Sequence, residues 1–176
     1  NDSGSQGSLQ IDNNTIQANS GNYGVTCTAA EITLDNNDIS GNSGKGLHLN
    51  NASGSVTGNS IAENGDMGIE LSDGSIGLRN NTITDNSGRG CYLSNYSGEM
   101  KNNTITGNSV TEGAGVRFSG GSPDFHHNTI SNNSGGSAVV VENGENIGFG
   151  ANNLSNPDCT YEIRLTDGND YDASCN

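Results

Sequence analysis

The sequence predicts an all-β fold, a parallel β-helix of about seven rungs with three short strands in each rung. Three observations support this fold class. A motif repeats every 22 to 25 residues, apolar and polar residues alternate inside each repeat, and Asn, Gly and Ser separate the alternating stretches. Self-similarity at such a period is typical of stacked repeats. Alternation with period two is typical of strands that have one buried face.

The repeat is clearest in the phrase Asn-Asn-Thr-Ile, which occurs at residues 80–83 and 102–105. The second asparagine of this phrase has a counterpart in every predicted rung: Asn14, Asn37, Asn59, Asn81, Asn103, Asn128 and Asn152. A further asparagine follows five residues after each of these except the last. Side-chain amides stacked at one corner can donate to one neighbour and accept from the other. We therefore expect asparagine-ladder corners, with these residues serving as scaffold.

Three strands are expected in each rung. The first surrounds the isoleucine of Thr-Ile-Thr, as at 82–84, the second follows a glycine, as at 91–93, and the third leads into the asparagine pair, as at 32–34. Glycines repeat before the second strand, as at Gly88 and Gly90, where a side chain would collide or φ is positive. At about 4.8 Å per rung, seven rungs make a rod about 34 Å long.

The chain divides into a polar N-terminal extension at 1–8, the parallel β-helix at 9–157 and a C-terminal cap at 158–176. Cys159 and Cys175 flank most of the last segment, and a disulfide between them would close a cap over the final rung. A closed loop of this length contributes about 3 kcal/mol in the chain-entropy account. Such a bond would also imply an oxidising compartment.

The other two cysteines are predicted to be buried thiols. Cys27 and Cys91 occupy inward positions about three rungs apart, which is beyond the reach of a disulfide. Free cysteine in such a position behaves as a small apolar side chain.

The N-terminal end shows no evident cap. Its first apolar strand, Leu9–Ile11, directly follows polar residues and would present an unpaired edge and an open core. Stacked repeats need a polar cover at their ends. We therefore expect either a covering segment or self-association of rods through this end.

The Ile-x-x-Asn steps, such as Ile39 to Asn42 and Ile83 to Asn86, combine with small Gly-x-Gly strand starts. This pattern resembles the right-handed parallel β-helix repeats of the pectate-lyase-like superfamily. It is also similar to the repeats of polymorphic outer-membrane proteins, in which Phe-x-x-Asn alternates with Gly-Gly-Ala-Ile, although here Ile replaces Phe and Gly-Gly-Ala-Ile never occurs intact. The superfamily contains polysaccharide lyases, hydrolases, epimerases, adhesins and passenger domains. The resemblance thus implies a scaffold and leaves the function open.

The amino-acid composition limits the classes of partner that the protein could bind. The chain has 20 acidic residues against six Lys and Arg, a formal net charge of −14. This balance argues against a nucleic-acid partner, because phosphate binding needs a basic face. No apolar run is long enough to predict a transmembrane segment. We expect a secreted or cell-surface protein.

Candidate chemical groups do not converge in the predicted arrangement. His48 and Glu70 are expected as stacked neighbours on successive rungs, and we interpret them as a surface ion pair rather than an acid/base pair. Alternation sends His126 and His127 to opposite faces, which would make them poor joint metal ligands beside Asp124. We therefore predict no catalytic, cofactor-binding or metal-binding residues.

One predicted face has a regular polar surface. Outward residues of the first strand would form two rows, spaced about 6.7 Å along the strand and about 4.8 Å between rungs. The candidate ligand or ice-binding residues are Thr15, Thr82, Thr84, Thr104, Thr106, Thr129 and Ser131. The rows resemble the Thr-x-Thr faces of β-helical antifreeze proteins, but Gln17, Asp38 and Ala62 interrupt them.

These observations favour a non-catalytic extracellular module with a structural or adhesive role. Two alternatives stay open. The first is ice binding through the threonine face, and the second is a carbohydrate-binding or polysaccharide-processing β-helix. A carbohydrate or ice surface is thus a candidate partner beside a second copy of the chain.

Overall fold

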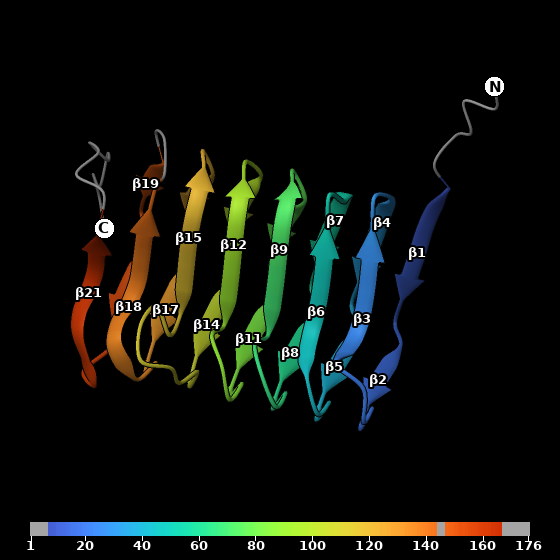
Figure 1. The fold of residues 1–176 in the computed structure, drawn as a ribbon, viewed down its shortest axis with the longest axis horizontal. Helices are drawn as coiled ribbons and strands as arrows, with labels where there is room; N and C mark the ends of the chain where they lie inside the picture. Colours follow the sequence, from blue (N-terminus) through green and yellow to red (C-terminus); the bar gives the residue numbers. More distant parts are fainter. Residues whose placement is uncertain (1–6, 144–146, 167–176) are drawn as a thin grey trace.

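The computed structural model describes residues 7–143 and 147–166. Its described residues form 21 strands and no helix, so no helix here could span a membrane. The strands assemble into three parallel sheets of seven strands each, stacked as a rod (Figure 1). The predicted fold class, three strands per rung and about seven rungs, is confirmed.

Each sheet collects one strand from every rung. Sheet A contains β1 (Ser8–Asp12), β4 (Glu31–Asp35), β7 (Ser53–Thr57), β10 (Gly77–Arg79), β13 (Glu99–Lys101), β16 (Asp124–His126) and β19 (Gly148–Gly150). Sheet B contains β2 (Thr15–Gln17), β5 (Asp38–Ser40), β8 (Ser60–Ala62), β11 (Thr82–Thr84), β14 (Thr104–Thr106), β17 (Thr129–Ser131) and β20 (Asn153–Ser155). Sheet C contains β3 (Tyr23–Thr28), β6 (Lys45–Asn50), β9 (Ile69–Gly74), β12 (Cys91–Tyr96), β15 (Val116–Gly121), β18 (Gly135–Glu142) and β21 (Cys159–Leu165).

The strands pair in register, so equivalent side chains form rows along the rod. In sheet B one inward row runs through Ile16, Ile39, Ile61, Ile83, Ile105, Ile130 and Leu154. Near the C-terminal end, Phe118, Phe125 and Phe149 pack edge to face, with ring centroids 5.2 to 6.5 Å apart. Cys27 and Cys91 are buried free thiols, as predicted.

Two asparagine ladders run along the rod, one at the corner between sheets A and B and one between sheets B and C. The first contains the predicted residues Asn14 to Asn152. The second contains Asn19, Asn42, Asn64, Asn86, Asn108, Asn133 and Asn156. From Asn37 onward in the first ladder and from Asn19 onward in the second, the Nδ2 donates to the Oδ1 of the next asparagine, as from Asn81 to Asn103 at 3.0 Å. The same Nδ2 also donates to a backbone carbonyl of the preceding rung.

A left-handed residue turns the chain at each corner. The corner between sheets A and B has φ near +55° at the residue before the ladder asparagine, as in Asn80 (56°), Asn102 (56°) and His127 (57°). In the repeated Asn-Asn pair, the first asparagine therefore takes the strained conformation, which asparagine tolerates, and the second enters the ladder.

Glycine is required where the chain enters sheet C. A Cβ on Gly68 would lie 2.8 Å from the Gly90 carbonyl oxygen and 2.7 Å from an Ile83 methyl carbon. These contacts are closer than packed carbon atoms allow. The predicted collision accounts for glycine at this place in successive rungs.

The C-terminal end continues the stack beyond the predicted boundary at 157. Strand β21 pairs with β18 in parallel, and its Ile163 lies opposite Val139. Glu162 closes the second ladder, because its carboxylate accepts hydrogen bonds from the backbone N–H and Nδ2 of Asn156 at 2.7 and 2.8 Å. The Cys159 Sγ lies 3.2 Å from the Asn133 carbonyl oxygen.

Candidate functional site

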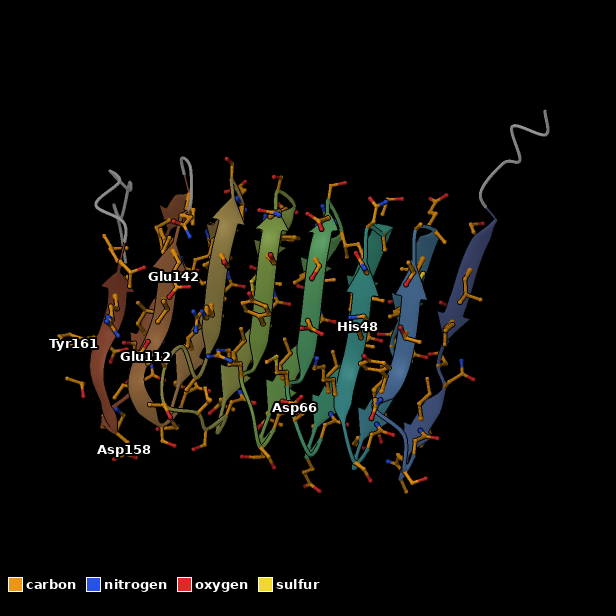
Figure 2. The ribbon with its side chains drawn as sticks, viewed as in Figure 1. His48, Asp66, Glu112, Glu142, Asp158 and Tyr161 are labelled. Carbon is orange, nitrogen blue, oxygen red and sulfur yellow. The ribbon has the colours of Figure 1, made fainter. Side chains whose placement is uncertain are left out.

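The outward face of sheet C carries the densest group of charged and aromatic side chains. We call it the sheet C face (Figure 2). Its central row is in register along the rod and runs through Thr26, His48, Glu70, Tyr92, Arg117, Val140 and Arg164. Four of the six Lys and Arg residues of the chain belong to this face or its border: Lys45, Arg89, Arg117 and Arg164.

At the N-terminal part of this face, Glu70 contacts a lysine and a histidine. Lys45 Nζ lies 2.6 Å from the Glu70 carboxylate, and His48 Nε2 lies 3.3 Å from the same oxygen. Desolvation lowers the pKa of Lys45, but the hydrogen bond and charge of Glu70 outweigh it, so the pKa is raised. The ring of Tyr23 stacks on His48 with centroids 4.6 Å apart. The expected contact between His48 and Glu70 is confirmed, with lysine as the closer partner.

In the middle of the face, an arginine covers a tyrosine ring. The Arg89 guanidinium lies 5.9 Å from the centroid of Tyr92, within cation–π range. Desolvation, and then the charge of Arg117, lowers the pKa of Arg89. Its buried Nε has no hydrogen-bond partner within the described part of the chain. Both side chains are half-buried, so the ring and the guanidinium are held in place while a ligand can still reach them.

At the C-terminal part, an inserted loop covers the face. The 25-residue step from Asn103 to Asn128 accommodates the segment 109–115, which bonds to the start of β18 through Val110 N–H and Ser134 O at 3.2 Å. Glu112 on this loop pairs with Arg164. Gly113 of the loop lies against Val140, since a Cβ added there would be 3.5 Å from the Val140 Cβ, and Val140 is fully buried although it points outward.

A further ion pair lies beside this loop. Arg117 pairs with Glu142 at 2.5 Å, and Figure 2 shows Glu112 and Glu142 near β18. Tyr23, Lys45, Arg89 and these carboxylates are not among the site residues that the sequence predicts. Two of these ion pairs could have been found from the sequence. Lys45 and Glu70, like Arg117 and Glu142, are separated by one rung plus two or three residues, so a long side chain on one strand reaches diagonally to the next strand.

The predicted threonine face is the outward side of sheet B. Its rows align as expected: Thr82, Thr104 and Thr129 share one row, and Thr84, Thr106 and Ser131 share the other. All are exposed or half-buried. One hydroxyl is engaged, since Thr84 Oγ1 donates to Asp85 at 2.9 Å. Thr15 lies in the first row but its neighbour in β5 is Asp38, so the N-terminal end of the grid is interrupted.

A third group lies on the outward side of sheet A. His126 Nε2 lies 3.3 Å from Glu99 Oε1 and 3.5 Å from Asp124 Oδ2, and the three ligand atoms lie within 4.8 Å of one another. We call these three residues the His–carboxylate cluster. Arg79 pairs with the other oxygen of Glu99, and this hydrogen bond holds the pKa of Glu99 below its ordinary value.

The expectation that His126 and His127 point to opposite faces is wrong. Their Nδ1 atoms lie 2.7 Å apart, in hydrogen-bond contact. The reason is the left-handed backbone of His127, with φ at 57°, because period-two alternation holds only while the chain stays extended.

Three in-register parallel sheets closed by ladder corners define a parallel β-helix protein. The family model described as a right handed beta helix region matches residues 2–154, and the chain belongs to that family. The scaffold resemblance and its handedness are thereby confirmed. Searches of curated proteins and of solved structures found no match.

Proposed function

We propose that this protein is a non-catalytic binding module with an adhesive role, and that the sheet C face contacts a saccharide chain outside the cell. The observation that carries this proposal is the pairing on that face. Lys45, Arg117 and Arg164 each have a carboxylate partner, while the rings of Tyr92 and His48 remain partly accessible between them. Side chains that are already held in place lose little conformational freedom on binding.

The arrangement suits sugars for two reasons. Tyrosine and histidine rings present flat apolar faces beside polar groups, and arginine and carboxylate groups can bind hydroxyls by charge-assisted hydrogen bonds. His48 and Tyr92 share a row and lie two rungs apart, about 10 Å at the spacing of stacked strands. That separation suits an extended saccharide chain running along the rod.

The carboxylates of this face support binding rather than hydrolysis. A glycoside hydrolase uses two carboxyl groups flanking the scissile bond, one of which donates a proton. Glu70 and Glu142 instead accept hydrogen bonds from Lys45 and Arg117. In these pairs the carboxylates serve to position the cations.

A panel of neutral and acidic polysaccharides tests the proposal, with binding measured on an array and products measured as new reducing ends or unsaturated sugars. We expect at least one ligand to bind with no product. Tyr92→Ala should weaken that binding about 3- to 10-fold, the worth of one aromatic contact. Tyr161→Ala is the matched control, because Tyr161 is exposed on the terminal strand β21 and, three residues from Arg164, is not part of the outward row of sheet C (Figure 2). Product formation would instead indicate a polysaccharide-processing enzyme. An equal loss of binding affinity in both variants would refute the assignment of the binding site to the sheet C face.

Ice binding through sheet B is the second candidate. The in-register rows from β11 to β17 favour it, because a two-dimensional lattice of hydroxyls is what a crystal surface requires. Thermal hysteresis of the wild-type protein is the measurement. Replacing Thr82 and Thr104 by lysine should abolish hysteresis without changing the circular dichroism spectrum, whereas wild-type protein without hysteresis or ice shaping removes this candidate.

Two further proposals concern the ends. Self-association through the N-terminal end is supported by Leu9, which is 47% exposed on β1, and light scattering over a concentration series tests it. A monomer at every concentration would contradict it.

The Cys159–Cys175 disulfide involves a residue outside the described part of the chain. Non-reducing peptide mass spectrometry should link the two cysteines, and free thiols at both Cys159 and Cys175 in oxidised protein would rule the cap out.

A further inference from the structure

We propose that the His–carboxylate cluster is a binding site for a divalent first-row transition metal, with zinc as the best-fitting ion. Glu99, Asp124 and His126 would supply three protein ligands, and water or a substrate group would complete the coordination. Imidazole and carboxylate together are a donor set that suits zinc. This site lies on sheet A and is separate from the proposed saccharide face.

The strand geometry explains how the three ligands meet. Asp124 and His126 are two residues apart in β16, so both side chains leave the same side of the sheet. Glu99 is the in-register partner of Asp124 on the neighbouring strand β13. An Asp-x-His stretch with glutamate on the adjacent rung therefore places one nitrogen and two oxygens together.

The separations fit a tetrahedral ion. Ligands about 2.0 to 2.1 Å from zinc, at tetrahedral angles, lie about 3.3 to 3.4 Å from each other. The distances from His126 Nε2 to the Glu99 and Asp124 oxygens are 3.3 and 3.5 Å. Both distances exceed the length of a strong charge-assisted hydrogen bond, which is about 2.7 to 2.9 Å. The three ligand atoms all lie within 4.8 Å of one another, so one ion could contact all of them after small side-chain movements.

Neighbouring groups orient two of the ligands. Arg79 pairs with Glu99 Oε2, which leaves Oε1 directed at His126. The Nδ1 of His126 contacts the Nδ1 of His127, so a proton on the first can be donated to the second. Nε2 of His126 then carries the lone pair that a metal needs. Such a second hydrogen bond is the usual support of a metal-binding histidine.

The next rung leaves the site open. The in-register partners of Asp124 and His126 on β19 are Gly148 and Gly150. A Cβ added to Gly148 would lie 3.5 Å from Asp124 Oδ1, and one added to Gly150 would lie 3.6 Å from the His126 Cβ. Because both side chains are missing, an ion and its water can reach the cluster from this side.

A second histidine provides a matched comparison. His48 Nε2 also lies 3.3 Å from a glutamate oxygen, but Lys45 Nζ lies 2.6 Å from that same oxygen. The ammonium occupies the position that a metal would need. Within the described residues, Glu99, Asp124 and His126 are the group of three such ligands that converges. His48→Gln is therefore the control for His126→Gln.

Isothermal titration of the full chain with ZnCl₂ tests the site, with Cys159→Ser and Cys175→Ser in every variant so that neither thiol binds zinc. We expect one saturable site that His126→Gln eliminates and His48→Gln leaves unchanged. Asp124→Asn and His127→Gln should each weaken binding about 10- to 100-fold, the range for ligand and supporting groups. Cobalt bound in place of zinc should give the visible absorption of a tetrahedral ion.

Two results would overturn the proposal. One is the absence of saturable zinc binding in a folded protein. The other is equal binding by the His126→Gln and His48→Gln variants, which would place the ion elsewhere. Circular dichroism shows whether each variant is folded, and the substituted His and Asp side chains of the test and control variants do not belong to the core or the ladders.

Discussion

Replacing Asn81 by alanine removes one step from the middle of the first ladder. The Asn81 Oδ1 accepts hydrogen bonds from the backbone N–H and the Nδ2 of Asn59, at 3.0 and 3.1 Å. Its Nδ2 donates to the Val56 carbonyl oxygen and to Asn103 Oδ1, at 2.8 and 3.0 Å. Asn81 is 1% exposed, so water cannot replace these partners without opening the rung.

The expected loss follows from those four hydrogen bonds. A buried hydrogen bond contributes roughly 1 kcal/mol, and a buried donor left without a partner costs roughly 1 to 3 kcal/mol. Loss of the Asn81 side chain removes the acceptor of the Asn59 N–H. We therefore expect the free energy of unfolding to fall by about 3 to 5 kcal/mol. Asn81→Asp should cost more, because a carboxylate would face the Val56 carbonyl and Asn103 Oδ1 with no donor.

Urea unfolding followed by circular dichroism measures this change. Asn14→Ala is the control, since the Asn14 Nδ2 donates a hydrogen bond to the Asp12 carbonyl oxygen at 2.9 Å, at the exposed end of the same ladder. It should lower the free energy of unfolding by less than about 1 kcal/mol. If Asn81→Ala falls within that range too, the ladder is not a source of stability and the reasoning fails.

One further substitution and the pH dependence of unfolding test the same scaffold. Gly68→Ala should lower the free energy of unfolding in urea by about 1 to 3 kcal/mol, because the added Cβ would lie 2.8 Å from the Gly90 carbonyl oxygen. An unchanged free energy of unfolding would contradict this, because it would mean that neighbouring rungs can move apart at no cost. Burial raises the pKa of both the Cys91 thiol and the Tyr96 hydroxyl. The unfolded chain then loses these protons first, so the two groups contribute no pH dependence below about pH 8.5, and above it the free energy of unfolding should fall by up to about 1.4 kcal/mol per pH unit for each group. A flat profile up to pH 10.5 would contradict this.

The rungs and their core could be predicted because each rung repeats the same constraints. An inward isoleucine and a ladder asparagine two residues before it occur at the same place in successive turns, so one alignment predicts three sheets. The last step of the second ladder was missed. Asn156 follows Asn152 by four residues instead of five, so fixed spacing does not find it, although it accepts from Asn133 as its predecessors do.

The outward faces were harder to predict because their contacts are diagonal. Register alone places Lys45 beside Tyr23, but its long side chain reaches Glu70 on β9. The contact between His126 and His127 was missed for another reason. Sequence alternation assumes an extended chain, and a histidine takes the left-handed corner position where asparagine or glycine is usual.

The central claim, a saccharide-binding face on sheet C, is tested most directly by amide chemical shifts of ¹⁵N-labelled protein titrated with the polysaccharide fragment that binds best on the array. The account predicts saturable shift changes on β6, β9 and β12, around His48, Glu70 and Tyr92. The amides of sheet B should stay unchanged. Shifts confined to sheet A or sheet B, or no saturable shift with any fragment of the panel, would contradict it.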